Sequence, residues 1–311
     1  MQQIDLRGII PAIVTPMTNE GALDLPALRR YADWLAEQGP VALAVNVDTG
    51  EGPHLTAEEK RQTLETVAEA VAGKCKIVGG VAGPSTAMGV SNARAAQDSG
   101  ADALLVFPIS AFLGQPLNLE VPYRYHAAIA EAVDLPLILF QLQPALGGVL
   151  FTTEILYKLI TIPSVVAIKE ASFDAMRFLQ VKAALESASR KITFLTGNDN
   201  FICESFILGA EGALLGFSTL GTREQVSMLA AIQRGDIAEA RELGARLQPL
   251  ADVIFAPPVT DYRARTKEAL KMLGILENTT VRPPLLPILE SELETIRNAL
   301  QNAELLRSPV S

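Results

Sequence analysis

Short runs of apolar residues alternate along most of the chain with longer segments in which apolar residues recur every three or four positions. The short runs predict β-strands, and the longer segments predict amphipathic helices. Several runs are almost continuously apolar, as in Ala103–Phe107 and Leu137–Phe140, which is typical of parallel strands covered on both faces. The predicted strands occupy residues 8–14, 41–46, 76–82, 102–107, 135–140, 164–169, 192–196 and 211–216. The predicted helices occupy residues 25–38, 57–72, 87–99, 120–132, 151–160, 173–187, 200–208, 222–233, 236–255, 261–273 and 288–303.

Eight predicted strands with helices between them are typical of a (β/α)8 barrel, in which parallel strands close into a cylinder surrounded by helices. We therefore predict the α/β class, with a TIM barrel over residues 1–233 and a C-terminal helical extension over residues 234–311. Thr56 and Glu59 form a capping-box pattern that predicts the start of one helix. No linker and no change of composition separates barrel from extension, so the extension is expected to pack on the barrel as one structural unit.

The composition argues against several classes of partner. With 26 Lys and Arg against 35 Asp and Glu, the net charge is −9, and without a basic run a nucleic-acid partner is not expected. The N-terminus has no secretory pattern, and no window reaches 18 consecutive apolar residues, which predicts a cytoplasmic protein that does not enter a membrane. Cys75 and Cys203 lack CxxC spacing, and with two histidines a metal site is not expected. His54 is expected in a loop and His126 on a helix surface.

Lys169 stands at the end of the sixth predicted strand, directly after the apolar run Val165–Ile168. An ammonium group next to a buried strand is unfavourable, and desolvation lowers its pKa and frees the amine as a nucleophile. The alternative interpretation is that Lys169 and Glu170 mark the point where the strand leaves the core and form a solvated pair. Because catalytic groups of such barrels follow the strand ends, Lys169 is the first candidate for a catalytic residue.

Other residues that follow predicted strands are candidates for the same site, because the carboxyl ends of barrel strands meet on one face. The second strand is followed by Asp48, Thr49 and Gly50, and Gly50 is expected to allow a tight turn. Asp48 is a candidate acid or base, or else caps the local turn. The remaining candidates at strand ends are Phe140, Gln141, Gly197 and Gly216.

Several of these pieces, in this order and spacing, resemble the family of dihydrodipicolinate synthase and N-acetylneuraminate lyase. The matching segments include Gly8–Pro16, Thr49–Gly52, Ile168–Glu170 and Lys267–Gly274, and the resemblance extends from residue 8 to about 305. It implies a class I aldolase or dehydratase that holds a small 2-oxo acid, such as pyruvate or a 2-keto-3-deoxy sugar acid, as a Schiff base on Lys169. That chemistry needs no metal or dissociable cofactor. The resemblance also implies a homodimer or homotetramer.

The same resemblance assigns roles to the loop after the second strand. The chain departs from the family pattern once in this loop and once at the fifth strand. Thr49 and Gly50 are expected to bind the substrate carboxylate. Asp48 replaces a hydroxyl residue of the family, so it either turns away, is protonated or acts as an acid or base. Phe140 replaces the family's proton-relaying tyrosine, and a phenylalanine cannot transfer a proton. The possible substitutes are Asp48, Gln141, Ser110, Tyr123 and Tyr125.

A third departure bears on the substrate. Leu146 stands where relatives carry the arginine that engages the carboxylate of aspartate semialdehyde, so dihydrodipicolinate synthase activity proper is not expected. The leading hypothesis is a lysine-imine lyase acting on another 2-oxo acid, with Gln141, Gly197 and Gly216 as further substrate-binding residues. The alternative is a catalytically impaired family member that serves as a small-molecule binding or regulatory protein, because a fold alone does not establish turnover.

Overall fold

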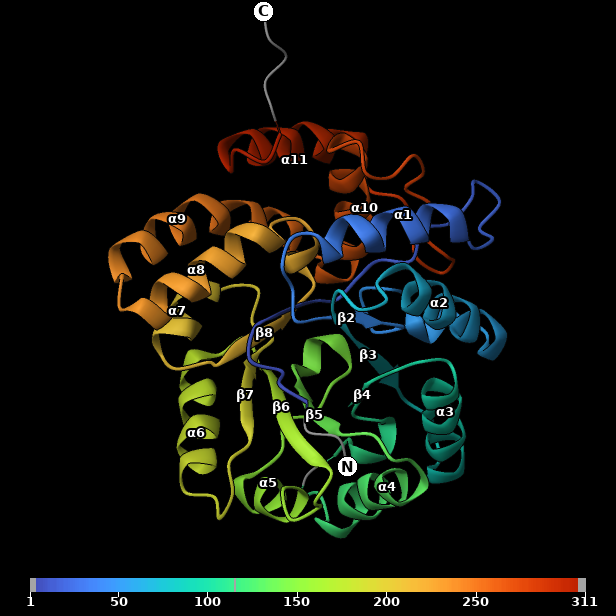
Figure 1. Ribbon diagram of the computed structural model, residues 1–311, viewed down its shortest axis with the longest axis vertical. Coiled ribbons are helices and arrows are strands. Elements are labelled where there is room, and N and C mark those ends of the chain that lie inside the picture. Colours follow the sequence, from blue (N-terminus) through green and yellow to red (C-terminus); the bar gives the residue numbers. More distant parts are fainter. Residues whose placement is uncertain (1–3, 115, 307–311) are drawn as a thin grey trace, which may run out of the picture.

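Eight parallel strands form the centre of the molecule, which we describe from a computed structural model covering residues 4–114 and 116–306 (Figure 1). Hydrogen bonding joins the strands in the order β1-β8-β7-β6-β5-β4-β3-β2. A parallel bridge between Ala12 and Ala44 joins β1 to β2 and closes the cylinder. The strands are β1 Ile9–Pro11, β2 Ala42–Val45, β3 Lys76–Val81, β4 Ala103–Val106, β5 Leu137–Leu142, β6 Val165–Ala171, β7 Thr193–Thr196 and β8 Gly212–Leu215. The predicted (β/α)8 barrel is therefore confirmed.

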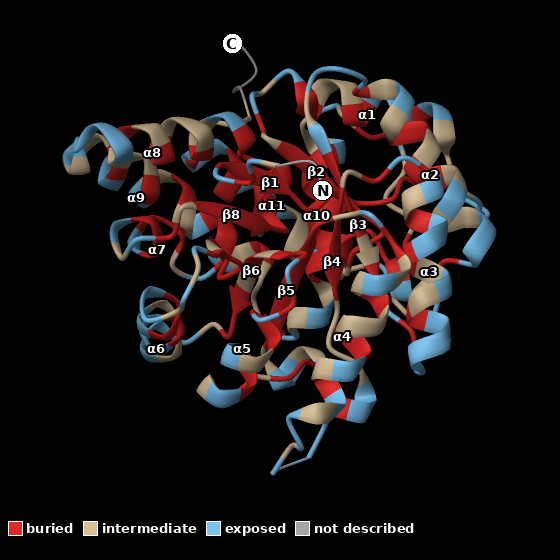
Figure 2. Cartoon of the chain, turned by 60° about the horizontal axis from the view of Figure 1, so that its bottom comes forward, coloured by how far each residue is buried: buried red, intermediate tan, exposed pale blue. Residues whose placement is uncertain are grey.

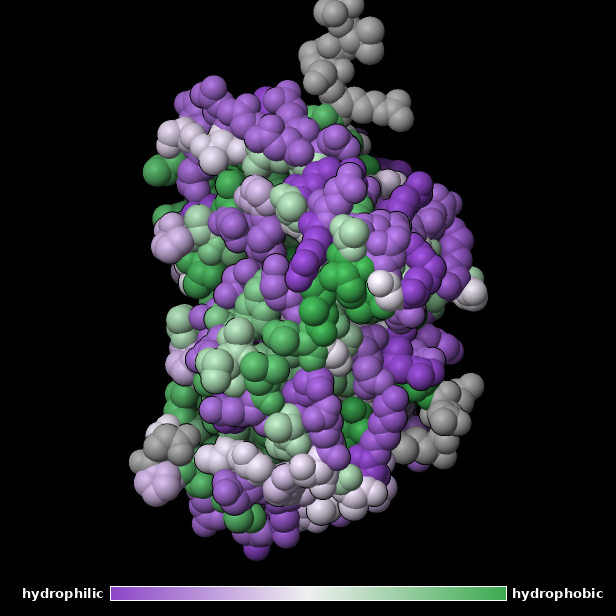
Figure 3. Space-filling view, turned by 90° about the vertical axis from the view of Figure 1, so that its left-hand side faces the viewer, coloured by the Kyte–Doolittle hydropathy of each residue, from purple (hydrophilic) through white to green (hydrophobic). Residues whose placement is uncertain are grey.

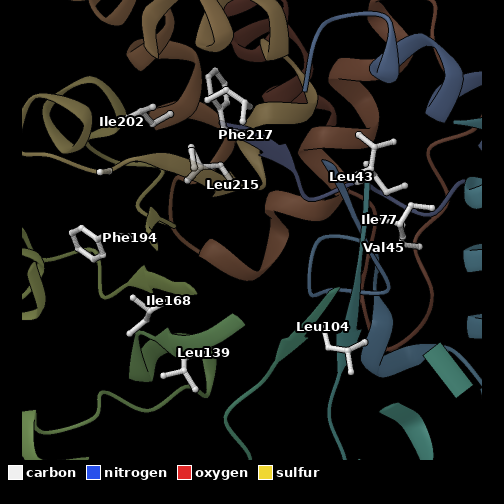
Figure 4. Close-up of a cluster of buried hydrophobic side chains, with 14 of the residues drawn as sticks. Leu43, Val45, Ile77, Leu104, Leu139, Ile168, Phe194, Ile202, Leu215 and Phe217 are labelled. Atoms are coloured by element: carbon white, nitrogen blue, oxygen red, sulfur yellow. The ribbon is translucent and has the colours of Figure 1, made fainter. Parts of the chain in front are cut away.

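Side chains alternate between the two faces of the barrel wall, which explains why the strands read as continuous apolar runs. The outward set packs against the helices and includes Leu139 and Ile168 (Figure 4). The inward set fills the barrel and includes Ile138, Phe140 and Ala167. Most strand residues are accordingly buried, while the surrounding helices expose one side to solvent (Figure 2).

Helices surround the barrel at the positions that the periodicity predicts. The capping box at Thr56 and Glu59 is present, with both reciprocal hydrogen bonds formed at the start of α2. The helices of the barrel are α1 Leu25–Ala36, α2 Ala57–Ala70, α3 Thr86–Asp98, α4 Glu120–Ala132, α5 Thr153–Leu159, α6 Ala175–Glu186, α7 Ile202–Ile207 and α8 Thr222–Arg234. In the described part of the chain, no helix is both long and apolar enough to cross a membrane.

The C-terminal extension consists of α9 Ile237–Ile254, α10 Tyr262–Met272 and α11 Glu290–Asn302. Helix α9 packs along α8. Helix α11 packs against α9 and lies above α9 in Figure 1. Helix α10 lies close to the loop that follows β2, and its buried Lys267 pairs with Glu51 of that loop. Residues 307–311 of the predicted extension lie outside the described part. The extension thus contacts the same face of the barrel to which the candidate residues were assigned.

Two details differ from the expectations. Strands β5 and β6 each run two residues beyond their predicted ends, so Lys169 lies inside a strand and not at its tip. His126 is fully buried and not on a helix surface. Its Nδ1–H donates to the carbonyl of Pro122 at 2.7 Å, and burial lowers the pKa of the imidazole to about 4. The helix face that carries His126 therefore belongs to the core.

Candidate active site

Lys169 projects into the barrel from β6, with Phe140 of β5 and Leu195 of β7 as its neighbours across the sheet. Its Nζ lies 4.3 Å from the centre of the Phe140 ring. The following residue, Glu170, points to the outer face, where it accepts hydrogen bonds from Asn198 and Ser172. The two residues therefore do not form the solvated pair of the alternative interpretation, because Lys169 and Glu170 lie on opposite faces of the barrel wall.

Burial shifts the pKa values of Lys169 and Asp199, which line one cavity, in opposite directions. It lowers the pKa of Lys169 to about 8, with the carboxyl groups of Asp199 and Asp48 acting in the other direction. It raises the pKa of Asp199 to about 7, against the N–H of Phe217, which donates to Oδ1 at 2.9 Å. A lysine that titrates near neutrality carries a usable fraction of free amine, so Lys169 is suited to nucleophilic attack on a carbonyl.

The loop after β2 adds Asp48 and Thr49 to the lining of the same cavity. Asp48 Oδ2 lies 2.6 Å from Nη2 of Arg263, and its backbone carbonyl accepts from Arg263 Nε at 2.8 Å. The phenol oxygen of Tyr262 lies 2.8 Å from Asp48 Oδ2 and 3.3 Å from Thr49 Oγ1. Because an arginine pairs with Asp48, its carboxylate does not present an uncompensated negative charge to a bound anion.

Gly50 and Glu51 complete this loop. A Cβ on Gly50 would lie 2.9 Å from the carbonyl oxygen of Ile13, so close backbone approach requires a glycine there. The left-handed conformation expected of a tight turn belongs instead to Glu51, whose φ is 55°. The Glu51 carboxylate is fully buried and accepts from Nζ of Lys267 and from the backbone N–H of Arg282 at 2.7 Å. Gly50 therefore allows the loop to pack closely against the backbone of Ile13. Glu51 connects the loop to the C-terminal extension.

Gly197 and Gly216 line the cavity, and a side chain at either position would crowd the residues around it. A Cβ on Gly197 would lie 2.6 Å from Cε of Lys169 and 2.7 Å from the Cβ of Ala171. A Cβ on Gly216 would lie 3.2 Å from Thr49 Oγ1. The backbone just after β7 and just after β8 thus lies directly against the functional side chains, as expected of glycines near a ligand site.

Gln141 is a candidate whose side chain the structure places outside the cavity, and Gly50 is likewise absent from the described lining residues. Gln141 follows Phe140 on β5, so its side chain lies on the outer face of the barrel. There its Oε1 accepts from the backbone N–H of Phe151 at 2.8 Å and from Arg177 Nη2 at 3.2 Å. Gln141 is absent from the described residues that line the cavity. Its side chain helps to hold the chain segment after β5 and does not face Lys169.

The cavity around Lys169 is narrow, with a volume of about 30 Å³, which is enough to hold a water molecule. Its lining residues are Val47, Asp48, Thr49, Phe140, Leu142, Leu146, Lys169, Ala171, Phe173, Gly197, Asp199, Gly216, Phe255 and Tyr262. A larger groove of about 660 Å³ lies at the opposite end of the barrel, between α4 and the segment before β6. Of the candidate residues, that groove is lined by Tyr123 alone, one of the possible substitutes for the family tyrosine, whereas Lys169, Asp48 and Thr49 line the narrow cavity, which is therefore the candidate site.

Comparison with known proteins places the whole chain in one group. The model of the dihydrodipicolinate synthetase family matches residues 5–303. The 4-hydroxy-tetrahydrodipicolinate synthase of Gluconacetobacter diazotrophicus is 31% identical over 306 residues, covering 98% of this chain and 100% of that protein. The enzyme of the same name from Corynebacterium aurimucosum is 33% identical over 298 residues, covering 95% and 94%. The chain belongs to the dihydrodipicolinate synthetase family.

Solved structures of this family have the same fold. The dihydrodipicolinate synthase of Acinetobacter baumannii, complexed with pyruvate, superposes with a TM-score of 0.86 at 30% identity, covering 97% of this chain and 100% of that one. The synthase of Thermotoga maritima gives a TM-score of 0.87 at 28% identity, covering 97% and 99%. The barrel and the appended helices are therefore shared throughout the length of these chains.

Within this family frame, sequence reasoning missed Tyr262. The residue opens α10, more than 200 positions after Asp48, and its phenol reaches the cavity only because the extension packs against the barrel. No local pattern marks it, since a tyrosine in the first turn of a helix is ordinary. Of the proposed substitutes for the family tyrosine, Ser110 is exposed, and Tyr125 donates to the carbonyl of Gly83 away from the cavity.

Proposed function

We propose that the protein is a Schiff-base lyase acting on a small 2-oxo acid, with Lys169 as the nucleophile. The observation that carries this proposal is a lysine on the inner face of β6 whose pKa burial lowers to about 8, inside a cavity lined by Thr49 and Gly197. Family membership supports it, as does the pyruvate complex of the A. baumannii relative.

The chemistry follows from the positions of these groups. The free amine of Lys169 attacks the C2 carbonyl, and the oxygen leaves as water to give an imine. The protonated imine withdraws electrons from C3, which permits carbon–carbon bond cleavage or formation, or elimination of a group on C4. Asp199, whose pKa is raised to about 7, is suited to take the proton that the ammonium loses. Thr49, in the lining of the cavity, offers a hydroxyl to the carboxylate of the oxo acid.

Trapping of the imine tests the proposal. Intact-protein mass is measured after borohydride treatment with pyruvate and a panel of 2-oxo acids, for the wild type and for Lys169→Arg. We expect a reduced adduct on the wild type that is absent from the variant. No adduct with any oxo acid would contradict the lyase and favour the alternative of a binding or regulatory protein.

The lining of the cavity bears on the rest of the substrate. The apolar part of the wall includes Leu142, Leu146, Phe173 and Phe255, and Lys169 is the one cation among the described lining residues. A second carboxylate would meet apolar carbon and no positive charge, which is unfavourable. We therefore infer a substrate whose portion beyond C3 is uncharged.

Synthesis of 4-hydroxy-tetrahydrodipicolinate is the second candidate, because relatives 31–33% identical over nearly the whole chain carry that name. The two candidates differ in their second substrate. Consumption of pyruvate with aspartate semialdehyde is compared with its consumption with uncharged aldehydes of similar length. Our proposal predicts faster turnover with the uncharged aldehydes, and preference for the semialdehyde would establish the synthase.

A further inference from the structure

The proposed lyase needs a proton carrier, and the barrel wall offers none at position 140. We propose that Tyr262 and Asp48 form a proton relay, brought together from the C-terminal extension and the β2 loop, that serves the imine on Lys169. This inference rests on the proposed function. It assigns a chemical role to the first turn of α10, a part of the chain outside the barrel proper.

The geometry of the pair carries the inference. The Tyr262 phenol oxygen lies 2.8 Å from Asp48 Oδ2, within ordinary hydrogen-bonding distance for O–H to a carboxylate. Both residues line the cavity that contains Lys169, and Tyr262 is almost completely buried. Its ring is held by stacking on Phe255, with centroids 4.8 Å apart and planes 17° apart. The hydroxyl is therefore fixed, close to Thr49 and within the site.

The carboxylate of the pair is fixed as firmly as the phenol. Arg263, next to Tyr262 on α10, contacts Asp48 Oδ2 at 2.6 Å and the Asp48 carbonyl at 2.8 Å. Arg263 also donates to the carbonyl of Thr260 at 3.0 Å. The guanidinium thus holds Asp48 in the orientation that accepts from Tyr262, without itself lining the cavity among the described residues.

The two residues can act only as a unit. Burial and the neighbouring charge of Asp48 raise the pKa of the Tyr262 phenol well above its usual range, so free phenolate is not accessible near neutral pH. A phenol that accepts a proton must then release its own hydrogen in the same step. Asp48 Oδ2 is in position to accept that hydrogen.

The proton steps balance as follows. The C3–H bond of the protonated imine breaks, and its electron pair forms the C2–C3 double bond while C2=N becomes a C–N single bond, giving an enamine. The proton passes to the Tyr262 oxygen as the phenol hydrogen passes to Asp48, which becomes a neutral carboxylic acid. The reverse transfer returns a proton to C3 or to a departing hydroxyl on C4. No oxidant, reductant or further reactant is required.

Exchange of the pyruvate methyl protons in deuterium oxide tests the relay without knowledge of the second substrate. Proton NMR follows the loss of the methyl signal, and the exchange rate is divided by the fraction of enzyme trapped as borohydride adduct. The variants are Tyr262→Phe, which keeps the stacked ring, and Asp48→Asn. The matched control is Tyr125→Phe, which removes a buried phenol bonded to the Gly83 carbonyl outside the cavity.

We expect Tyr262→Phe to form the adduct as the wild type does but to exchange roughly 10²- to 10⁴-fold more slowly per imine, the usual contribution of a general acid or base. Tyr125→Phe should exchange at the wild-type rate. Exchange within a few-fold of wild type in Tyr262→Phe would overturn the relay, as would a wild type that forms the adduct but does not exchange.

Failure of the proposed function has a different signature, which is the absence of an adduct in every variant and in the wild type. Asp48→Asn leaves Arg263 without its carboxylate and is expected to lose stability. For that reason the exchange rate of Tyr262→Phe is the deciding measurement. The exchange rate of Asp48→Asn is used only if thermal unfolding shows that this variant is folded.

Discussion

At the scale of single residues, the desolvation of Lys169 is the feature from which the proposed chemistry follows. With a pKa of about 8, roughly a tenth of the amine is neutral at pH 7, against about one part in 3,000 for an ordinary lysine of pKa 10.5. Because only the neutral form attacks a carbonyl, the rate of imine formation should rise about tenfold between pH 6 and 7 and level off above pH 8. Stopped-flow or quench trapping across this range measures the profile.

Replacing Asp199 tests the cause of this pH profile, because the account predicts the direction in which the midpoint moves. Its carboxylate raises the pKa of Lys169, so Asp199→Asn should move the midpoint of the profile to lower pH. A midpoint that stays in place or moves to higher pH would contradict the inference that the Asp199 carboxylate raises the pKa of Lys169.

Gly197→Ala tests whether the backbone just after β7 sets the position of the lysine. The added methyl would lie 2.6 Å from Lys169 Cε, so the side chain must be displaced. We expect the borohydride adduct to fall at least tenfold while thermal unfolding shows a folded protein. The control is Gly221→Ala, where the atom nearest to the added methyl is Leu247 Cδ2 at 3.3 Å. Gly235 is unsuitable as a control, because its φ of 82° would strain an alanine. Full adduct formation in Gly197→Ala would show that Lys169 is not held there.

How far such residues can be predicted depends on whether they follow a strand. Lys169, Thr49 and Gly197 could be placed together because strand ends of a parallel barrel share one face. Phe140 and Gln141 are consecutive in a strand, and the alternation of side chains means that both cannot face inward. The sequence therefore contained the reason to exclude one of them. Tyr262 could not be found, since the contact is set by the packing of a distant helix.

At the scale of elements, the β2 loop and α10 are joined by a buried ion pair. Lys267 and Glu51 are both fully buried, and Lys267 Nζ also donates to the carbonyl of Thr280 at 2.6 Å. This link holds the loop that carries Asp48 against the helix that carries Tyr262. It couples the stability of the molecule to the geometry of the relay.

Lys267→Met should destabilise the protein by about 3–5 kcal/mol, because the Glu51 carboxylate would remain buried without its partner. Urea denaturation measures the loss. Arg124→Met, which breaks an exposed pair with Glu120 on one helix, should change the midpoint little. The double variant Glu51→Gln with Lys267→Met should recover much of the loss. Equal midpoints for Lys267→Met and the wild type would contradict the account of the link.

Most elements could be predicted from the sequence because each carries its own local signal. The eight strands are apolar runs covered on both faces, and Thr56 with Glu59 fixes the start of α2. Hydrophobicity predicts ends of β5 and β6 that are too early because Gln141 and Glu170 are polar, although both make hydrogen bonds on the outer face of the barrel. Polar residues with buried partners cannot be distinguished from strand ends by hydrophobicity alone.

At the scale of the whole molecule, the side formed by α6 and α7 exposes apolar side chains. Met176 is 66% exposed, and Leu179 and Ile207 are each 38% exposed. Figure 3 views this side and shows apolar surface across its middle, between more polar regions. Clustered exposed apolar residues are typical of surfaces that associate. We propose that this side is covered in a homodimer or homotetramer.

Sedimentation velocity tests the assembly. The wild type should sediment as a species of two or four chains of 33.3 kDa, and Met176→Glu combined with Ile207→Glu should shift it towards a smaller species. One solved relative is described as a monomeric dihydrodipicolinate synthase variant, so a monomer is compatible with the fold. A wild-type monomer would contradict the proposal, and an unchanged size in the double variant would place the interface elsewhere.

The central claim is that the imine forms on Lys169 and on no other lysine. Peptide mass mapping of the wild type, after reduction with borohydride in the presence of pyruvate, tests it most directly. The account predicts the modification on the peptide that contains Lys169, while the buried Lys267 and the surface lysines stay unmodified. Modification spread over surface lysines, or confined to another residue, would contradict it.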